Sequence, residues 1–217
     1  MAVASKKAKV TGEARQQAAA PRGAARRQLI IDVATRQFLE RGYDGASLDS
    51  IVREMGGSKG TIYRHFTGKE ELFSAVIRES MSLEEVMSID AAAPPAEALT
   101  TYATRQLAVM TSAKVIELLR SVVASARLYP AIARMFDDLA PSTAMSIVAE
   151  YLARLQADGR LASGDTAEAA EDFYGLLLRS LVTRELLGVA PAMSKAAVAA
   201  HARRAVGKFL TLHPIRG

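Results

Sequence analysis

Two adjacent glycines, Gly56 and Gly57, interrupt an otherwise helix-forming stretch, residues 47–66. Glycine tolerates the left-handed backbone conformation that a sharp reversal after a helix requires. Before the glycines, apolar residues recur at spacings of three and four and form one face of a helix: Leu48, Ile51, Val52 and Met55. Ser47 and Ser58 precede the two segments and can each cap a helix start. The stretch therefore predicts a helix, a tight turn and a second helix.

The second helix is predicted to bury one stripe and to present a face rich in hydrogen-bond donors. Ile62 and Phe66 lie four residues apart and form the inward stripe. Gly60 and Arg64 point furthest from Ile62, and Thr61 lies beside them. Such a helix fits the major groove of DNA, where an arginine reaches guanine acceptors and a glycine allows close approach. The alternative is an ordinary helical hairpin with a solvated charged face.

The residues that follow the second helix favour the DNA interpretation. The pattern G-x-S-x-G-T-I-Y-R-H-F, which ends at Phe66 and is followed by K-E-x-L from Lys69, resembles the DNA-binding domain of TetR-family transcriptional regulators. The resemblance implies DNA contacts from nine residues: Ser47, Ser58, Lys59, Gly60, Thr61, Tyr63, Arg64, His65 and Lys69. Among them, Tyr63 and Lys69 are expected to contact phosphates.

The chain departs from the family pattern near the turn. Members of the family usually carry a small residue at the position of Val52 and a β-branched residue at the position of Gly57, so the two sizes are exchanged here. Met55 is also larger than the common alanine. We expect Val52 and Met55 to fill the space that Gly57 leaves.

The positive charge is concentrated at the N-terminus. The chain of 217 residues has a formal net charge of +5. Residues 1–27 carry seven lysines and arginines against one acid, so the remaining residues are close to neutral. Residues 1–24 have no apolar period and are expected to be disordered. They are either an arm that reaches DNA phosphates, whose binding would weaken with salt, or a solubilising tail.

The pattern of helix starts and breaks predicts an all-α chain of two domains. Residues 25–90 would form a DNA-binding domain, with a first helix at about 25–41 and a long helix at 67–89 that is capped by Thr67 and Glu70. Pro94 and Pro95 then interrupt the helical pattern. Residues 91–217 are expected to form a second domain with helices at about 96–112, 114–128, 131–139, 142–158, 165–188 and 195–212.

The second domain is also similar to the C-terminal domain of a TetR subgroup, over residues 118–152 and 173–177. The resemblance implies an effector cavity, with seven candidate lining residues: Leu119, Val122, Val123, Met135, Phe136, Phe173 and Leu177. The last two helices are apolar around most of their girth, which favours a four-helix interface between two copies. Candidate interface residues are Leu178, Leu181, Val182, Val198, Val206 and Phe209. Arg120 and Arg179 lie in apolar stretches and would meet an anionic ligand or form ion pairs.

The sequence offers no recognisable catalytic or metal site. The chain has no cysteine and three histidines, and its histidines and acids do not follow metal-ligand spacings. We therefore expect no enzyme activity, no cofactor and no metal. There is no secretory signal and no apolar run long enough for a bilayer, so a cytoplasmic protein that joins the nucleoid when bound to DNA is expected.

Taken together, these features predict an N-terminal three-helix helix-turn-helix domain, joined by a long helix to a helical ligand-binding and dimerisation domain. The predicted function is a ligand-responsive repressor that binds a palindromic DNA operator as a homodimer and responds to a small hydrophobic effector. The alternatives are a non-specific DNA-binding protein driven by the basic tail, and a helical adaptor or enzyme that keeps the helix-turn-helix as scaffold.

Overall fold

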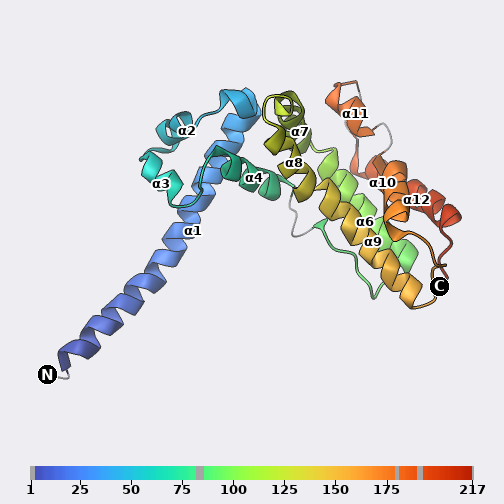
Figure 1. Ribbon diagram of the computed structural model, residues 1–217, viewed down its shortest axis with the longest axis horizontal. Helices are drawn as coiled ribbons and strands as arrows, with labels where there is room; N and C mark the ends of the chain where they lie inside the picture. The colour runs from blue at the N-terminus through green and yellow to red at the C-terminus, as the bar shows by residue number, and fades with distance from the viewer. Residues whose placement is uncertain (1–2, 82–85, 179–180, 190–192, 217) are drawn as a thin grey trace. The chain divides into compact units, whose positions relative to one another are not determined.

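Helices make up both units into which the chain divides, residues 1–76 and residues 77–217 (Figure 1). The computed structural model describes residues 3–81, 86–178, 181–189 and 193–216. The described residues contain no β-strand, and their one isolated bridge pairs Leu161 with Ile215. The expected all-α fold is therefore confirmed. The division between the units falls earlier than the proline break expected at residues 94 and 95, because Met81 and Val86 are buried with second-unit residues.

The first unit consists of three helices and the beginning of a fourth. They are α1 (Val3–Gly45), α2 (Leu48–Met55), α3 (Lys59–Tyr63) and α4 (Lys69–Ser80), the last of which continues into the second unit. The predicted stripe of the first helix is buried: Ile30, Val33, Ala34 and Phe38. The Phe38 ring packs edge-on against Phe73 of α4, with 4.7 Å between ring centroids, and both rings contact Tyr43.

The first helix begins much earlier than the sequence pattern indicated. Residues 1–24 were expected to be disordered, yet α1 begins at Val3. Alanine, lysine, glutamine and arginine dominate this segment, and all have high intrinsic helix propensity even without an apolar face. At the other end, Gly42 has the non-helical φ of 68° expected of a residue that stops the helix.

The reversal between α2 and α3 depends on two glycines in conformations that other residues rarely adopt. Gly56 has φ 68° and Gly57 has φ 127°. The Arg26 guanidinium of α1 donates a hydrogen bond of 2.6 Å to the Gly56 carbonyl. A Cβ atom placed on Gly57 would lie 2.8 Å from Arg26 Nη2 and 3.8 Å from Met55 Cε. The expectation that Val52 helps fill this space is therefore not supported, because the Arg26 guanidinium lies there instead.

The start of α4 is capped differently from the prediction. The Glu71 carboxylate, rather than that of Glu70, accepts hydrogen bonds from the backbone N–H and the hydroxyl of Thr67, at 2.6 and 2.7 Å. The helix begins two residues after Thr67, so the carboxylate that reaches back lies four residues on. These bonds hold the pKa of Glu71 below its ordinary value. The helix also ends at Ser80, short of the expected residue 89, and residues 82–85 lie outside the described part.

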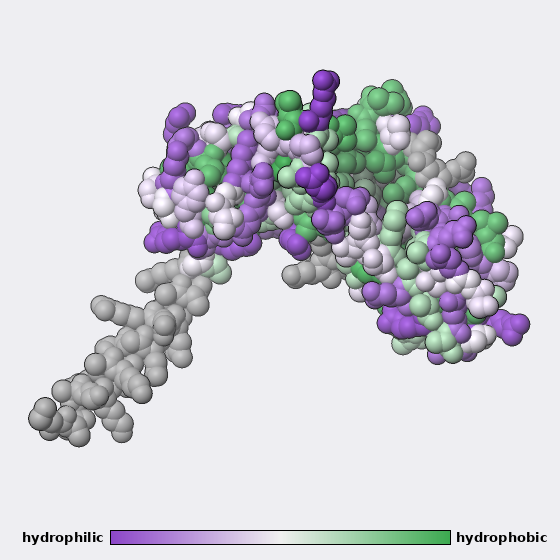
Figure 2. Space-filling model, viewed as in Figure 1, coloured by the Kyte–Doolittle hydropathy of each residue, from purple (hydrophilic) through white to green (hydrophobic). Residues whose placement is uncertain are grey.

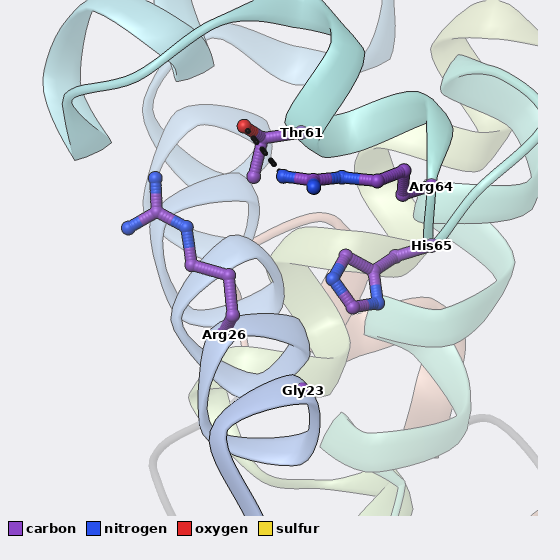
Figure 3. A pocket seen from close by; sticks show the side chains of 5 residues that line it. All are labelled: Gly23, Arg26, Thr61, Arg64 and His65. Atoms are coloured by element: carbon purple, nitrogen blue, oxygen red, sulfur yellow. Dashed lines mark hydrogen bonds between the residues drawn. The ribbon is translucent and has the colours of Figure 1, made fainter. Parts of the chain in front are cut away.

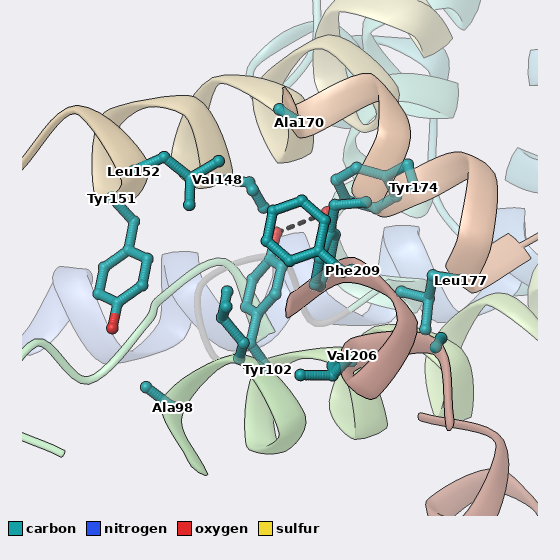
Figure 4. Packing of buried hydrophobic residues seen from close by; sticks show 14 of the residues in the cluster. Ala98, Tyr102, Val148, Tyr151, Leu152, Ala170, Tyr174, Leu177, Val206 and Phe209 are labelled. Atoms are coloured by element: carbon teal, nitrogen blue, oxygen red, sulfur yellow. Dashed lines mark hydrogen bonds between the residues drawn. The ribbon is translucent and has the colours of Figure 1, made fainter. Parts of the chain in front are cut away.

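The second unit packs its long helices around one aromatic core (Figure 4). Its helices are α6 (Pro95–Met110), α7 (Ala113–Ser125), α8 (Pro130–Leu139), α9 (Pro141–Ala157), α10 (Thr166–Leu178), α11 (Leu181–Leu186) and α12 (Lys195–Leu212). Phe173 of α10 packs edge-on against Phe209 of α12, with ring centroids 5.4 Å apart. Tyr102 of α6 and Tyr174 of α10 share a buried hydrogen bond of 2.6 Å between their hydroxyl groups.

The helix predicted at residues 165–188 is described in two parts, α10 and α11, because residues 179–180 lie outside the described part. Arg120 of α7 holds the end of α11, because its guanidinium donates to the carbonyl oxygens of Leu186 and Glu185 at 2.9 and 2.7 Å. Arg120 also pairs with Glu117 on its own helix. The guanidinium therefore forms an ion pair and caps α11, a contact that helical periodicity does not reveal.

We predict that Gly57→Ala destabilises the first unit. An alanine there would have to adopt a φ of 127° and displace Arg26, so the cost should be about 1–3 kcal/mol. Gly23→Ala is the matched control, since a Cβ at that helical glycine meets nothing within 4 Å. Urea unfolding of both variants measures the difference, and equal stabilities would contradict the proposed role of the turn.

The Thr67–Glu71 contact should make stability depend on pH in the acid range. The folded-state pKa of Glu71 is lowered, so its contribution is fully present above the ordinary glutamate pKa and is lost as the pH falls from there through the lower folded-state pKa. At pH 7 we expect Glu71→Ala to lower the free energy of unfolding more than Glu70→Ala does. The difference between the two variants should disappear towards pH 3, as followed by denaturant titration. A difference that is independent of pH would be inconsistent with the contact.

Candidate nucleic-acid interface

The helix α2 is fixed at both ends before α3 begins. The Ser47 hydroxyl accepts a hydrogen bond from the Ser50 N–H at 3.1 Å, and the Ser50 hydroxyl accepts one from the Ser47 N–H at 3.2 Å. At the other end, Glu54 pairs with Arg36 of α1 at 2.8 Å and also accepts a hydrogen bond from Gln37. These hydrogen bonds lower the pKa of Glu54 and so keep it ionised. Ser47, predicted to contact DNA, has its hydroxyl engaged in this cap.

The exposed face of α3, with the residue that follows it, carries four of the nine positions predicted to contact DNA. Lys59, Gly60, Tyr63 and Arg64 are exposed, and the Tyr63 side chain is 55% accessible. Ile62 and Phe66 are buried, as predicted for the inward stripe. The face therefore offers an ammonium, a phenol and a guanidinium beside a position without a side chain.

Thr61 does not lie on this exposed face, contrary to the prediction. It is only 8% accessible. Its hydroxyl lies 3.5 Å from the Ser58 hydroxyl and accepts a hydrogen bond from Arg64 at 3.4 Å. The five-residue helix places Thr61 on the side that faces α1, which the helical wheel alone did not resolve. Thr61 is thus placed to orient the Arg64 guanidinium.

Two of the predicted lysines have partners within the chain. Lys59 forms an ion pair of 2.9 Å with Asp49 of α2, and this hydrogen bond raises the pKa of Lys59. Lys69 donates to the Asp44 carbonyl at 3.3 Å and lies 4.3 Å from the centroid of the Tyr43 ring. Partial burial lowers the pKa of Lys69. Lys69 therefore joins the start of α4 to the end of α1, a contact that the predicted phosphate role did not include.

An open basic hollow lies between α1 and α3 (Figure 3). It is lined by Gly23, Arg26, Thr61, Arg64 and His65. His65 and Arg64 were predicted to contact DNA, whereas Arg26 was counted only among the seven basic residues of positions 1–27. A sequence signal did exist, since Arg26 lies one helical turn before the buried Ile30 and so belongs to the folded part of α1. The hollow thus adds a guanidinium to the surface beside α3.

The surface over α2 and α3 is mainly polar in the view of Figure 2, with apolar surface at the α7–α8 end of the second unit. Val123 and Leu128, at that end, are 60% and 69% accessible. A polar face with several cationic side chains is the composition expected of a surface that meets phosphates and base edges.

The candidate effector residues of the second unit do not gather around one cavity. Phe173 and Leu177 belong to the main core, and Val122 and Phe136 are also buried. Val123 is exposed, whereas Leu119 and Met135 are half-buried. The apolar cavity among the described residues of this unit has a different lining, on α6, α9, α10 and the segment before α6.

The candidate dimer residues divide into two groups. Val198, Val206 and Phe209 are at most 6% accessible and form part of the core of the unit itself, so a second copy could not reach them in this fold. The interface expectation for these three is therefore corrected. Leu178, Leu181 and Val182 are half-buried and remain candidates.

Comparisons with known proteins agree with this geometry. Residues 30–76 match the family model described as bacterial regulatory proteins of the tetR family. Residues 97–213 match the model for the C-terminal domain of AefR-like transcriptional repressors. A protein from Mesorhizobium loti, whose crystal structure is described as that of a TetR-family transcriptional regulator, superposes with a TM-score of 0.76 and 30% identity, over 88% of this chain and 98% of that one. The flavonoid-responsive regulator FrrA gives a TM-score of 0.74 and 26% identity, over 88% and 97%.

Curated relatives match mainly the first unit. The transcriptional repressor AcnR of Corynebacterium diphtheriae is 46% identical over 54 residues, which are 25% of this chain and 28% of that protein. The chain spans 28–34% of the length of the first three curated repressors it matches. Within the described residues, we find no helix with the length and apolarity needed to cross a bilayer. Because one family model covers more than half of the residues and a second covers the helix-turn-helix, this chain belongs to the TetR family of bacterial transcriptional regulators.

Proposed function

We propose that the protein is a repressor that binds a palindromic DNA operator as a homodimer and releases it when a small effector binds the second unit. The observation that carries the proposal is the exposed face of α3, where Lys59, Tyr63 and Arg64 surround Gly60 on a helix-turn-helix fixed by the Ser47 cap and by Arg26. In this proposal the protein acts in the cytoplasm, on the nucleoid.

The chemistry of each side chain suggests its contact with DNA. Arg64, oriented by Thr61, would donate to the O6 and N7 acceptors of guanine in the major groove. The Tyr63 phenol would donate to a phosphate at the edge of the groove, and the absence of a side chain at Gly60 would allow the backbone to approach. The hollow that includes Arg26 and His65 would receive a neighbouring phosphate of the same strand.

A second copy of the chain would pack on the outward faces of α10 and α12. Gly175 of α10 and Gly207 of α12 lie opposite the buried stripes of their helices, and a Cβ at either meets nothing within 4 Å. Leu178, half-buried on α10, borders the same face. A twofold axis there would give two copies of α3, which is what a palindromic operator requires.

The effector is expected to be a small, largely apolar molecule. The structural neighbour FrrA is described as flavonoid-responsive, and the cavity of the second unit is lined mainly by apolar side chains. Binding would favour one of two states of the protein that differ in affinity for the operator.

The first test is selection of operator sequences from a random DNA library with the full chain. We expect one palindromic motif to be recovered. Arg64→Ala should then weaken binding by about 1–3 kcal/mol and relax the sequence preference at one base pair of each half-site. Lys59→Ala should weaken binding to all DNA sequences alike. It should also reduce the slope of the logarithm of the binding constant against the logarithm of the salt concentration by about one per protomer. Arg134→Ala, an exposed arginine on α8, is the matched control and should bind normally.

Fluorescence anisotropy with labelled duplexes distinguishes the proposal from its rivals. If no motif is recovered and deletion of residues 1–22 abolishes binding, the protein binds DNA non-specifically through its tail. If neither the full chain nor the deleted chain binds DNA, the helix-turn-helix serves only as scaffold. Under our proposal the deletion weakens binding and flattens its salt dependence, but the recovered motif stays the same.

The proposed interface is tested by Gly207→Trp. Because a side chain at Gly207 meets open space within the chain, the monomer should fold, whereas an indole at the centre of the interface should weaken dimerisation at least about tenfold. Gly164→Trp is the control, since that loop glycine is equally open. Analytical ultracentrifugation measures both variants, and unchanged dimerisation of Gly207→Trp would place the interface elsewhere.

A further inference from the structure

An apolar cavity lies inside the second unit, next to its aromatic core. Its volume is about 70 Å³. The described residues that line it are Met81, Met87, Gln106, Met110, Ala140, Pro141, Ala144, Met145, Tyr174 and Leu178. Four of these are methionines, half of the eight in the chain. The thioether side chain is flexible and polarizable, so a wall with four methionines can change shape to receive a guest.

The described wall of this cavity carries no charged side chain. Its polar side chains are Gln106, whose amide donates to the Val86 carbonyl at 3.2 Å, and Tyr174. Burial raises the pKa of Tyr174 and of its partner Tyr102, so both phenols stay neutral at physiological pH. A charged ligand would lose its hydration here without gaining a counter-ion.

The two tyrosines also indicate which polar group a ligand would need. The Tyr102 hydroxyl donates to the Ala144 carbonyl at 3.3 Å and lies 2.6 Å from the Tyr174 hydroxyl. Each phenol has a single proton, so both bonds form together only if Tyr174 donates to Tyr102. The Tyr174 oxygen then keeps a lone pair that can accept a hydrogen bond. A hydroxyl group on the ligand would supply that donor.

We propose that this methionine-lined cavity is the effector site of the regulator, and that it takes an uncharged, mostly apolar molecule with a hydroxyl group that donates to Tyr174. The inference rests on the proposed function, because an effector is meaningful only for a protein that binds an operator. It replaces the candidate lining drawn from sequence with residues that enclose a space.

The position of Met81 gives the cavity a covalent route to the DNA-binding unit. Met81 directly follows α4, which ends at Ser80 and whose earlier residues Leu72 and Phe73 are buried. A ligand larger than the present cavity must displace the Met81 side chain or its neighbours on the wall. Such a displacement would act on the end of α4, the helix that begins in the first unit.

The test uses the full chain and isothermal titration calorimetry with two probes of the same shape, 2-naphthol and 2-naphthoate. We expect the neutral phenol to bind and the carboxylate to bind at least about a hundredfold more weakly, because its charge would be desolvated. Tyr174→Phe should weaken 2-naphthol about 5- to 10-fold, since one hydrogen bond is lost. Met145→Trp should fill the cavity and weaken the binding of 2-naphthol at least about tenfold, because the larger side chain takes the space that the ligand needs.

Met135→Trp is the matched control, because Met135 is half-buried on α8 and does not line the cavity. Operator binding of each variant without a probe is measured separately by anisotropy. If wild-type and variant chains bind the operator but 2-naphthol does not bind, or binds no better than 2-naphthoate, the cavity proposal is overturned while the proposed function stands. Equal affinity of Met145→Trp and wild type for 2-naphthol would also overturn it. Absence of operator binding in the wild type would instead contradict the proposed function.

Discussion

The hydrogen bond from Arg26 to the Gly56 carbonyl is the contact on which the geometry of the first unit depends most. It joins α1 to the turn between α2 and α3, at the point where Gly57 has a backbone conformation that a β-branched residue could not adopt. The guanidinium occupies the place that a side chain on Gly57 would need. A loss of apolar side-chain volume in the turn is thus compensated by a cation from another helix, and the same cation lines the hollow beside α3.

The sequence allowed much of this architecture to be predicted because helical periodicity is a local property. The buried stripe that includes Ile30 and Phe38, the inward pair Ile62 and Phe66, and the cap at Ser47 all follow from spacing and from the chemistry of single residues. The boundaries of most helices in the second unit also lie within a few residues of the prediction, since prolines and glycines mark them.

What the sequence could not show is where the ends of long side chains lie. Glu70 and Glu71 are adjacent and have the same side chain, and only the exact start of α4 decides which carboxylate reaches Thr67. Thr61 was predicted on the outward face because the sequence does not fix the boundaries of so short a helix. A shift of about one residue changes which side chains face outward. Phe209 looked like an interface residue because an apolar helix is equally consistent with a core and with a dimer.

The size of the methionine-lined cavity bears on how an effector could act at all. A ligand changes an equilibrium only by the difference between its affinities for two states. The cavity of about 70 Å³ is far smaller than the roughly 300–1,000 Å³ of common ligand sites. A molecule with two fused rings would therefore fit only an enlarged arrangement of the wall, and its affinity for the present arrangement would be negligible. The small size of the cavity would then provide the discrimination between the two states, because enlargement must move residues such as Met81 that continue directly from α4.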